Sequence, residues 1–224
     1  MQYQVNKNLL QIREEIAPYT PHIIAVTKYF DENAIIEAYN AGLRDFAESR
    51  VIEASEKINN LPQNVKENST FHFIGHLQTN KVKKVIEIFD IIHSLDSLKL
   101  AEKISQEAGN IGKIQKVLLQ VNNAGEEQKF GFSKEGLYKD FDAILALKNL
   151  EIMGLMNIAP LNSTEQELKQ LFSEIVSIRD DLRQKFNCSL DEISMGMSQD
   201  YKIAAQTGAT MLRIGRKLFS KTEE

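Results

Sequence analysis

A lysine at the end of an apolar run is the first feature of this sequence that could do chemistry. The run His22-Ile-Ile-Ala-Val-Thr-Lys28 is typical of a buried strand with an amine at its end. An amine that is partly removed from water keeps more of its neutral form, which is the nucleophile that adds to an aldehyde. A lysine at a strand end can equally extend its ammonium group into solvent. Position alone leaves Lys28 either a reactive amine or a surface cation.

Glycines and a serine near the C-terminus could form an anion site. Ser194-Met-Gly-Met-Ser198 ends one β-rich run just before a helical pattern, and Arg213-Ile-Gly-Arg216 ends the last run. Glycine lets the backbone approach a ligand closely, and free N–H groups at such ends attract phosphate. We therefore expect Ser198, Gly215 and Arg216 to form a phosphate cradle. In the simpler interpretation Ser198 only caps a helix and Gly215 only forms a turn.

Polar residues interrupt two other segments. Arg213 lies within the apolar run 210–214, where an unpaired charge would be costly, so it meets either a carboxylate or a ligand. His72 and His76 are four residues apart, a spacing that could suggest a metal site. Because the segment is typical of a strand that runs into a loop, and no cysteine or carboxylate completes a ligand set, we interpret both as hydrogen-bonded histidines.

Eight β-rich runs alternate with helical patterns and would position these groups. Such alternation implies parallel strands joined by crossovers, and eight units in 224 residues favour an α/β fold of the (β/α)8 TIM barrel class over a doubly wound open sheet. In that barrel the groups above would meet at the C-terminal ends of the strands. The expected strands are His22–Thr27, Arg44–Ala47, Thr70–Ile74, Asp90–Ser94, Ile114–Val121, Glu151–Asn157, Glu192–Met195 and Thr210–Ile214.

The helical patterns have start and stop signals of their own. An extra helix over Val5–Ile16 precedes the first strand. Asp31 is placed to cap the next helix and Gly42 to end it, while Thr164 with Glu167 has the spacing of a capping box. Two hydrophilic stretches, Asn59–Ser69 and Asn122–Lys134, are interpreted as loops.

Composition narrows the class of protein. The net charge is −4 and no basic stripe is present, which argues against a nucleic-acid surface. The single cysteine, Cys188, cannot form an internal disulfide and fits a reducing compartment. No segment resembles a signal peptide or is long enough to span a membrane. We expect a soluble cytoplasmic protein with one domain over residues 1–224, and, since no apolar stripe demands a partner, a monomer.

Taken together, these segments resemble one family. They are similar to the pyridoxal phosphate homeostasis proteins, whose fold is related to the N-terminal barrel of alanine racemases. They cover almost the whole chain, and the second and sixth are the most specific. In chain order they are Ile24-Ala-Val-Thr-Lys28, Phe71-His-Phe-Ile-Gly-His-Leu-Gln-Thr-Asn-Lys81, Ile92-His-Ser-Leu-Asp96, Lys129-Phe-Gly-Phe132, Met153-Gly-Leu-Met156, Ser194-Met-Gly-Met-Ser-Gln-Asp200 and Gly208-Ala-Thr-Met-Leu-Arg-Ile-Gly215.

The resemblance implies that pyridoxal 5′-phosphate (PLP) binds at the barrel mouth. Lys28 would hold it as a Schiff base. Ser198, with backbone groups near Gly215 and Arg216, would hold the phosphate, and Arg213 would face the pyridine nitrogen.

Three more residues are implied at the mouth. Met195 and His76 would line the pocket. The family usually has Phe-Gly-Glu-Asn where this chain has Phe46-Ala-Glu-Ser49. Ser49 therefore stands where the family carries an asparagine near the cofactor.

The implied function is a carrier of PLP. PLP acts best as an electron sink when its ring nitrogen is protonated, and a permanent cation opposite that nitrogen disfavours this. Because few residues follow the last expected strand, we expect no second domain of the kind that supplies a tyrosine base in alanine racemases. We expect a protein that holds PLP and buffers or delivers it to PLP-dependent apoenzymes. The rivals are a weak racemase acting through Lys28, a Schiff-base aldolase, and an interaction protein with a vestigial site.

Overall fold

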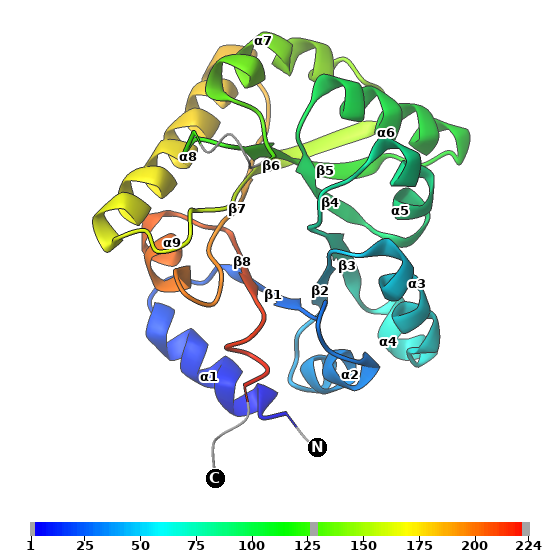
Figure 1. Ribbon diagram of the computed structural model, residues 1–224, viewed down its shortest axis with the longest axis vertical. Helices are drawn as coiled ribbons and strands as arrows, with labels where there is room; N and C mark the ends of the chain where they lie inside the picture. The colour runs from blue at the N-terminus through cyan, green and yellow to red at the C-terminus, as the bar shows by residue number, and fades with distance from the viewer. Residues whose placement is uncertain (1–2, 126–129, 221–224) are drawn as a thin grey trace.

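Eight parallel strands form a closed barrel in the order β1 to β8 (Figure 1). The computed structural model describes residues 3–125 and 130–220. The predicted barrel is confirmed, and each predicted strand differs from the observed one by at most one residue at either end. The strands are β1 His22–Val26, β2 Asp45–Glu48, β3 Thr70–Phe73, β4 Ile91–Leu95, β5 Gln115–Val121, β6 Leu150–Asn157, β7 Glu192–Ser194 and β8 Met211–Ile214.

The pairing of the first and last strands closes the barrel. Ile24 lies beside Arg213 and Ala25 beside Ile214 in a parallel register. Because side chains alternate along a strand, every second residue points into the barrel. An apolar cluster fills part of this interior with Ile24, Val26, Ala47, Leu118, Met156 and Met211.

Helices surround the barrel and cover its outer face, as Figure 1 shows. The larger core lies between them and the strands, where Phe46, Phe141 and Phe172 are fully buried. The helices are α1 Val5–Ile16, α2 Glu32–Asn40, α3 Val51–Asn60, α4 Gln63–Glu67, α5 Val82–Ile88, α6 Leu98–Asn110, α7 Lys134–Leu145, α8 Glu165–Phe186 and α9 Tyr201–Thr207, with a 3-10 turn, η1, over Thr79–Lys81.

The predicted helix signals are confirmed. Asp31 accepts a hydrogen bond from the N–H of Ala34 at the start of α2. Gly42 follows that helix with φ +96°, a left-handed conformation that favours glycine. Thr164 and Glu167 bond each other's backbone N–H groups in a complete capping box. These local signals fix where the crossover helices begin and end.

The prediction of one loop over Asn59–Ser69 is wrong. α3 continues to Asn60, and residues 63–67 form the short helix α4 after Pro62. α4 buries only Val65, so its sequence carries no apolar periodicity that would reveal a helix. In the other predicted loop, Asn122–Lys134, residues 126–129 lie outside the described residues, and α7 begins at Lys134.

Membrane-spanning helices are not found in residues 3–125 and 130–220: none there is both long and apolar enough.

Candidate functional site

Lys28 stands two residues beyond the end of β1, at the C-terminal mouth of the barrel. The residue is half-buried, and its Nζ lies 5.0 Å from the centre of the Tyr29 ring. Such a contact attracts a lysine side chain to the face of the ring. The amine is thus placed at the rim, in a position that is neither sealed in the core nor fully in solvent.

A buried ion pair holds the end of β1 just before this lysine. Glu48, the last residue of β2, accepts hydrogen bonds from Thr27 Oγ1 at 2.7 Å and from Lys57 Nζ at 2.6 Å. Lys57 Nζ also donates to the carbonyl of Thr27 at 2.8 Å. Only 2% of the Glu48 side chain and 10% of the Lys57 side chain are exposed. The residue preceding Lys28 is therefore fixed through both its backbone and its side chain.

The loops that follow β7 and β8 meet beside β1. Ser198 Oγ accepts a hydrogen bond from the backbone N–H of Lys217 at 3.3 Å. A Cβ atom at Gly215 would lie 3.3 Å from the carbonyl oxygen of Val26, so this loop lies close against the strand that leads to Lys28. The backbone N–H of Arg216 donates to no group in the described part of the chain. The three segments predicted to share one rim do share it.

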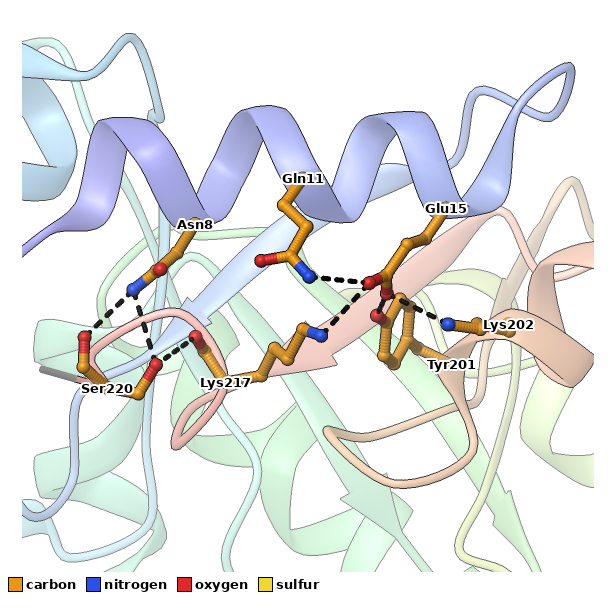
Figure 2. Close-up of polar contacts among 7 residues, drawn as sticks. All are labelled: Asn8, Gln11, Glu15, Tyr201, Lys202, Lys217 and Ser220. Atoms are coloured by element: carbon orange, nitrogen blue, oxygen red, sulfur yellow. Dashed lines mark hydrogen bonds and ion pairs between the residues drawn. The ribbon is translucent and has the colours of Figure 1, made fainter. Parts of the chain in front are cut away.

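The N-terminal helix supports the loop after β8 from outside, as Figure 2 shows. Asn8 Nδ2 donates to the carbonyl oxygens of Leu218 and Ser220, both at 2.9 Å. Glu15 pairs with Lys217 and with Lys202 of α9, each at 3.2 Å, and accepts a hydrogen bond from the Tyr201 hydroxyl. α1 thus connects the first turn of α9, which follows the β7 loop, with the loop after β8.

The ionisation of Glu15 reflects these contacts. Partial burial alone would raise the pKa of its carboxyl group, but hydrogen bonds from Tyr201, Gln11, Lys202 and Lys217 outweigh that effect and lower the pKa to about 2. The carboxylate is therefore charged at every pH at which the protein is expected to work.

Arg213 is buried inside the barrel, with 3% of its surface exposed. Its Nη1 donates to Ser194 Oγ at 2.6 Å and its Nη2 to the carbonyl of Asn157 at 2.8 Å. Burial lowers the pKa of Arg213 to about 10, although the negative charge of Asp200 acts in the opposite direction. The guanidinium stays protonated at neutral pH and keeps further N–H groups for a ligand.

The two histidines of β3 and β4 continue this polar interior. His93 Nδ1 lies 2.9 Å from Ser194 Oγ, and His93 Nε2 lies 2.9 Å from His72 Nδ1. His72 Nε2 lies 3.0 Å from Asp45 Oδ1. Complete burial, helped by His72 and Arg213, holds the pKa of His93 well below the usual histidine value. The interpretation of His72 as a hydrogen-bonded histidine is confirmed.

His76 lies at the rim, where it is exposed. Its Nδ1 is 3.5 Å from Asp96 Oδ2, and its ring stacks on Phe130 with centres 3.5 Å apart. Within the described residues no group of three or more histidine, cysteine, aspartate or glutamate side chains could hold a metal ion.

The other two residues predicted at the mouth differ in placement. Ser49 directly follows β2 and is half-buried. A Cβ atom at Gly75 would lie 2.2 Å from the carbonyl oxygen of Ser49, so glycine allows the two loops to touch.

Met195 is fully buried and belongs to the core between barrel and helices. Because Ser194 points inward, the next side chain points outward, and the structure does not bring Met195 to the mouth.

Sequence reasoning missed the roles of His93 and Ser194. A signal for them exists, because polar residues at inward positions of otherwise apolar strands need partners across the barrel. Lys57 and Glu15 carried no such signal, because each is a charged residue of an amphipathic helix, where charged residues are ordinary.

Comparison with known proteins places this geometry in a family. The model of the alanine racemase N-terminal domain matches residues 3–222. The pyridoxal phosphate homeostasis protein of Synechocystis sp. strain PCC 6803 is 42% identical over 202 residues, which cover 90% of this chain and 92% of the relative. The human protein of the same name is 35% identical over 217 residues, covering 91% of this chain and 77% of the human one.

Solved structures agree. PipY of Synechococcus elongatus PCC7942, solved with PLP bound, is 38% identical and has a TM-score of 0.88, with 97% of this chain and 100% of PipY covered. Alanine racemase of Clostridium difficile 630 shares the fold at 16% identity, with a TM-score of 0.76 over 98% of this chain and 57% of the racemase. The chain belongs to the pyridoxal phosphate homeostasis proteins, a family built on the alanine racemase N-terminal domain.

Proposed function

We propose that this chain binds PLP covalently through Lys28 and acts in intracellular PLP homeostasis. The observation that carries the proposal is the position of Lys28 next to the β7 and β8 loops, which the bond between Ser198 and Lys217 joins. A barrel rim that presents an amine beside backbone donors fits an aldehyde that carries a phosphate. The relatives' name and the PLP bound to PipY support the same ligand.

The residues present fit three polar groups of PLP: the aldehyde, the phosphate and the ring nitrogen. Lys28 would attach the aldehyde carbon, and Ser198 with the N–H of Arg216 would hold the phosphate. Arg213 would donate to the ring nitrogen with an N–H group that Ser194 and Asn157 leave unused. When bound, PLP supplies an electrophilic carbon and an electron-withdrawing ring.

Arg213 also supports the role of carrier over that of catalyst. Because the pKa of Arg213 is about 10, the guanidinium is protonated at neutral pH and can only donate, so it cannot accept a hydrogen bond from a protonated ring nitrogen. The nitrogen then keeps its lone pair and the ring withdraws electrons less strongly. The alternative is a weak amino-acid racemase, which the shared barrel of alanine racemase supports at the level of fold alone.

We also propose one domain over residues 1–224, a monomer, a cytoplasmic location and transfer of PLP to PLP-dependent apoenzymes. The single cysteine, Cys188, supports the cytoplasmic location, and the sequence has no apolar stripe that demands a partner, which supports the monomer. Light scattering after size exclusion tests the monomer, and reactivation of an apoenzyme by the PLP-loaded protein tests the transfer.

Borohydride reduction followed by peptide mapping tests the site. We expect the pyridoxyl group on Lys28, loss of the visible absorption band in Lys28→Ala, and an unchanged band in Lys116→Ala, which removes an exposed lysine at the opposite end of the barrel. A stable adduct on another lysine would overturn the assignment. Exchange of the α-proton of added amino acids into deuterium oxide, lost in Lys28→Ala, would favour the racemase.

A further inference from the structure

Four hydrogen bonds in series run through the barrel interior. Arg213 Nη1 bonds to Ser194 Oγ at 2.6 Å, and Ser194 Oγ to His93 Nδ1 at 2.9 Å. His93 Nε2 bonds to His72 Nδ1 at 2.9 Å, and His72 Nε2 to Asp45 Oδ1 at 3.0 Å. The five side chains come from β8, β7, β4, β3 and β2, so the series joins strands on different sides of the barrel.

The series leads from the mouth to the opposite end. His72 and His93 are at most 1% exposed and Arg213 is 3% exposed. Asp45, at the N-terminal end of β2, has 31% of its side chain exposed. It lines a hollow of about 460 Å³ at that end, together with His22 and other residues of the loops before β1 and β2. The polar path thus has one end under the mouth and the other in contact with solvent.

The chemistry of the two end groups sets the direction of the donors. An arginine can only donate, and an ionised aspartate can only accept. If both histidines are neutral, His72 must donate from Nε2 to Asp45, and its Nδ1 must then accept from His93 Nε2. His93 Nδ1 in turn accepts from the Ser194 hydroxyl. Every donor then points from Arg213 towards Asp45. Each ring nitrogen of the two histidines and the hydroxyl of Ser194 then has a hydrogen-bond partner.

We propose that Ser194, His93 and His72 are positioning residues, which form a hydrogen-bond relay whose donors all point from Arg213 towards Asp45 and which fixes the orientation of the Arg213 guanidinium. The proposal deepens the proposed function, on which it rests in so far as Arg213 faces the PLP ring. Ser194 uses its lone pair on Arg213 and its hydrogen on His93, so it cannot rotate without losing one bond. The relay therefore holds the Arg213 guanidinium in one orientation below the mouth of the barrel.

The protons of His72, His93 and Ser194 could also be arranged in the opposite direction. If His72 were an imidazolium ion beside Asp45, its Nδ1–H would donate to His93 Nε2, and His93 would donate from Nδ1 to Ser194 Oγ. The serine would then accept twice, and its hydrogen would be free to turn elsewhere. This arrangement places a second positive charge in the same interior as Arg213, which burial makes unfavourable.

Nitrogen-15 NMR of the histidine rings separates the two arrangements in protein without PLP. The chain has four histidines, so replacing each in turn assigns the signals. We expect both His72 and His93 to be neutral with the proton on Nε2 at pH 7. A His93 ring protonated on Nδ1, or an imidazolium at His72, would overturn the relay. This readout does not depend on PLP, so it stands even if Lys28 does not carry the cofactor.

The second test asks whether the relay acts on the cofactor. We expect Ser194→Ala to weaken PLP binding about tenfold and to move the visible band of the bound cofactor, because Arg213 loses a fixed charged hydrogen bond. Ser105→Ala removes a buried serine of α6 outside the barrel and should leave both unchanged. The same effect in both variants, or no effect in Ser194→Ala, would overturn the proposal. Loss of the adduct in Lys28→Ala separately tests the proposed function.

Discussion

Ser198 and Lys217 are connected by a hydrogen bond of 3.3 Å from the backbone N–H of the lysine to the serine hydroxyl. The two residues are 19 positions apart and belong to the loops after β7 and β8. Loops in these positions are the usual phosphate site of this barrel class. The bond means that the two walls of the proposed phosphate site are already held together by the protein, so little ordering remains to be done when a phosphate enters.

Ser198→Ala should weaken PLP binding about tenfold and leave the affinity for pyridoxal, which lacks the phosphate, nearly unchanged. The reason is that, in the proposed site, the hydroxyl would contact only the phosphate end of the ligand. Spectroscopic titration with both ligands checks this, with Ser163→Ala of the β6–α8 loop as the control variant. Equal losses of affinity for PLP and for pyridoxal would contradict the assignment of Ser198 to the phosphate.

The sequence predicts the barrel well because its signals are local. Apolar runs such as 22–27 and caps such as Asp31 act within a few residues, and each was found where expected. The alternation of strands and helices then limits the fold to a few possible strand orders. The failure at α4 has a local cause too, since a helix that buries only Val65 leaves no periodic pattern.

The partners within the site depend on long-range contacts that no local pattern specifies. Glu15 and Tyr201 are 186 residues apart, and His93 and Ser194 are 101 apart. The sequence can indicate that a buried polar residue needs a partner, but the partner follows from barrel register. Met195 shows the same limit. Side chains alternate between the inside and the outside of the barrel, so an error of one residue in placing a strand moves a side chain from the mouth to the helices.

Lys57→Met should destabilise the protein by about 3 kcal/mol, because it leaves the buried charge of Glu48 without its partner. The double variant Glu48→Gln with Lys57→Met should recover part of that loss, since it removes both charges. Urea unfolding of wild type, both single variants and the double variant measures the coupling. Simple additivity of the two single effects would contradict a direct ion pair.

Gly75→Ala should cost about 2 kcal/mol or more and disturb the rim, because its Cβ would lie 2.2 Å from the carbonyl oxygen of Ser49. Gly136→Ala is the matched control. That glycine lies in the first turn of α7, where a Cβ meets only the Ser133 hydroxyl at 3.2 Å and alanine favours the helix. Thermal unfolding of both variants checks the contrast, and equal melting temperatures would refute the close approach of the two loops.

Glu15→Gln should destabilise the protein at pH 7 and much less at pH 2–3. The folded pKa of Glu15 is about 2, below the value of about 4.5 for an unperturbed glutamate. A lowered folded pKa adds stability that is complete above the unfolded pKa and is lost as the pH falls towards the folded pKa. Since the carboxylate is partly exposed, solvent screening reduces the gain, and we expect about 1–2 kcal/mol at pH 7.

Urea unfolding at pH 7 and pH 3 measures this difference, with Glu14→Gln as the control on an exposed position of the same helix. Because α1 supports the loop after β8, Glu15→Gln should also raise hydrogen exchange at residues 215–220, while exchange in β3 and β4 stays unchanged. A loss of stability that is equal at both pH values would show that the lost packing, and not the carboxylate charge, connects α1 to the proposed phosphate loop.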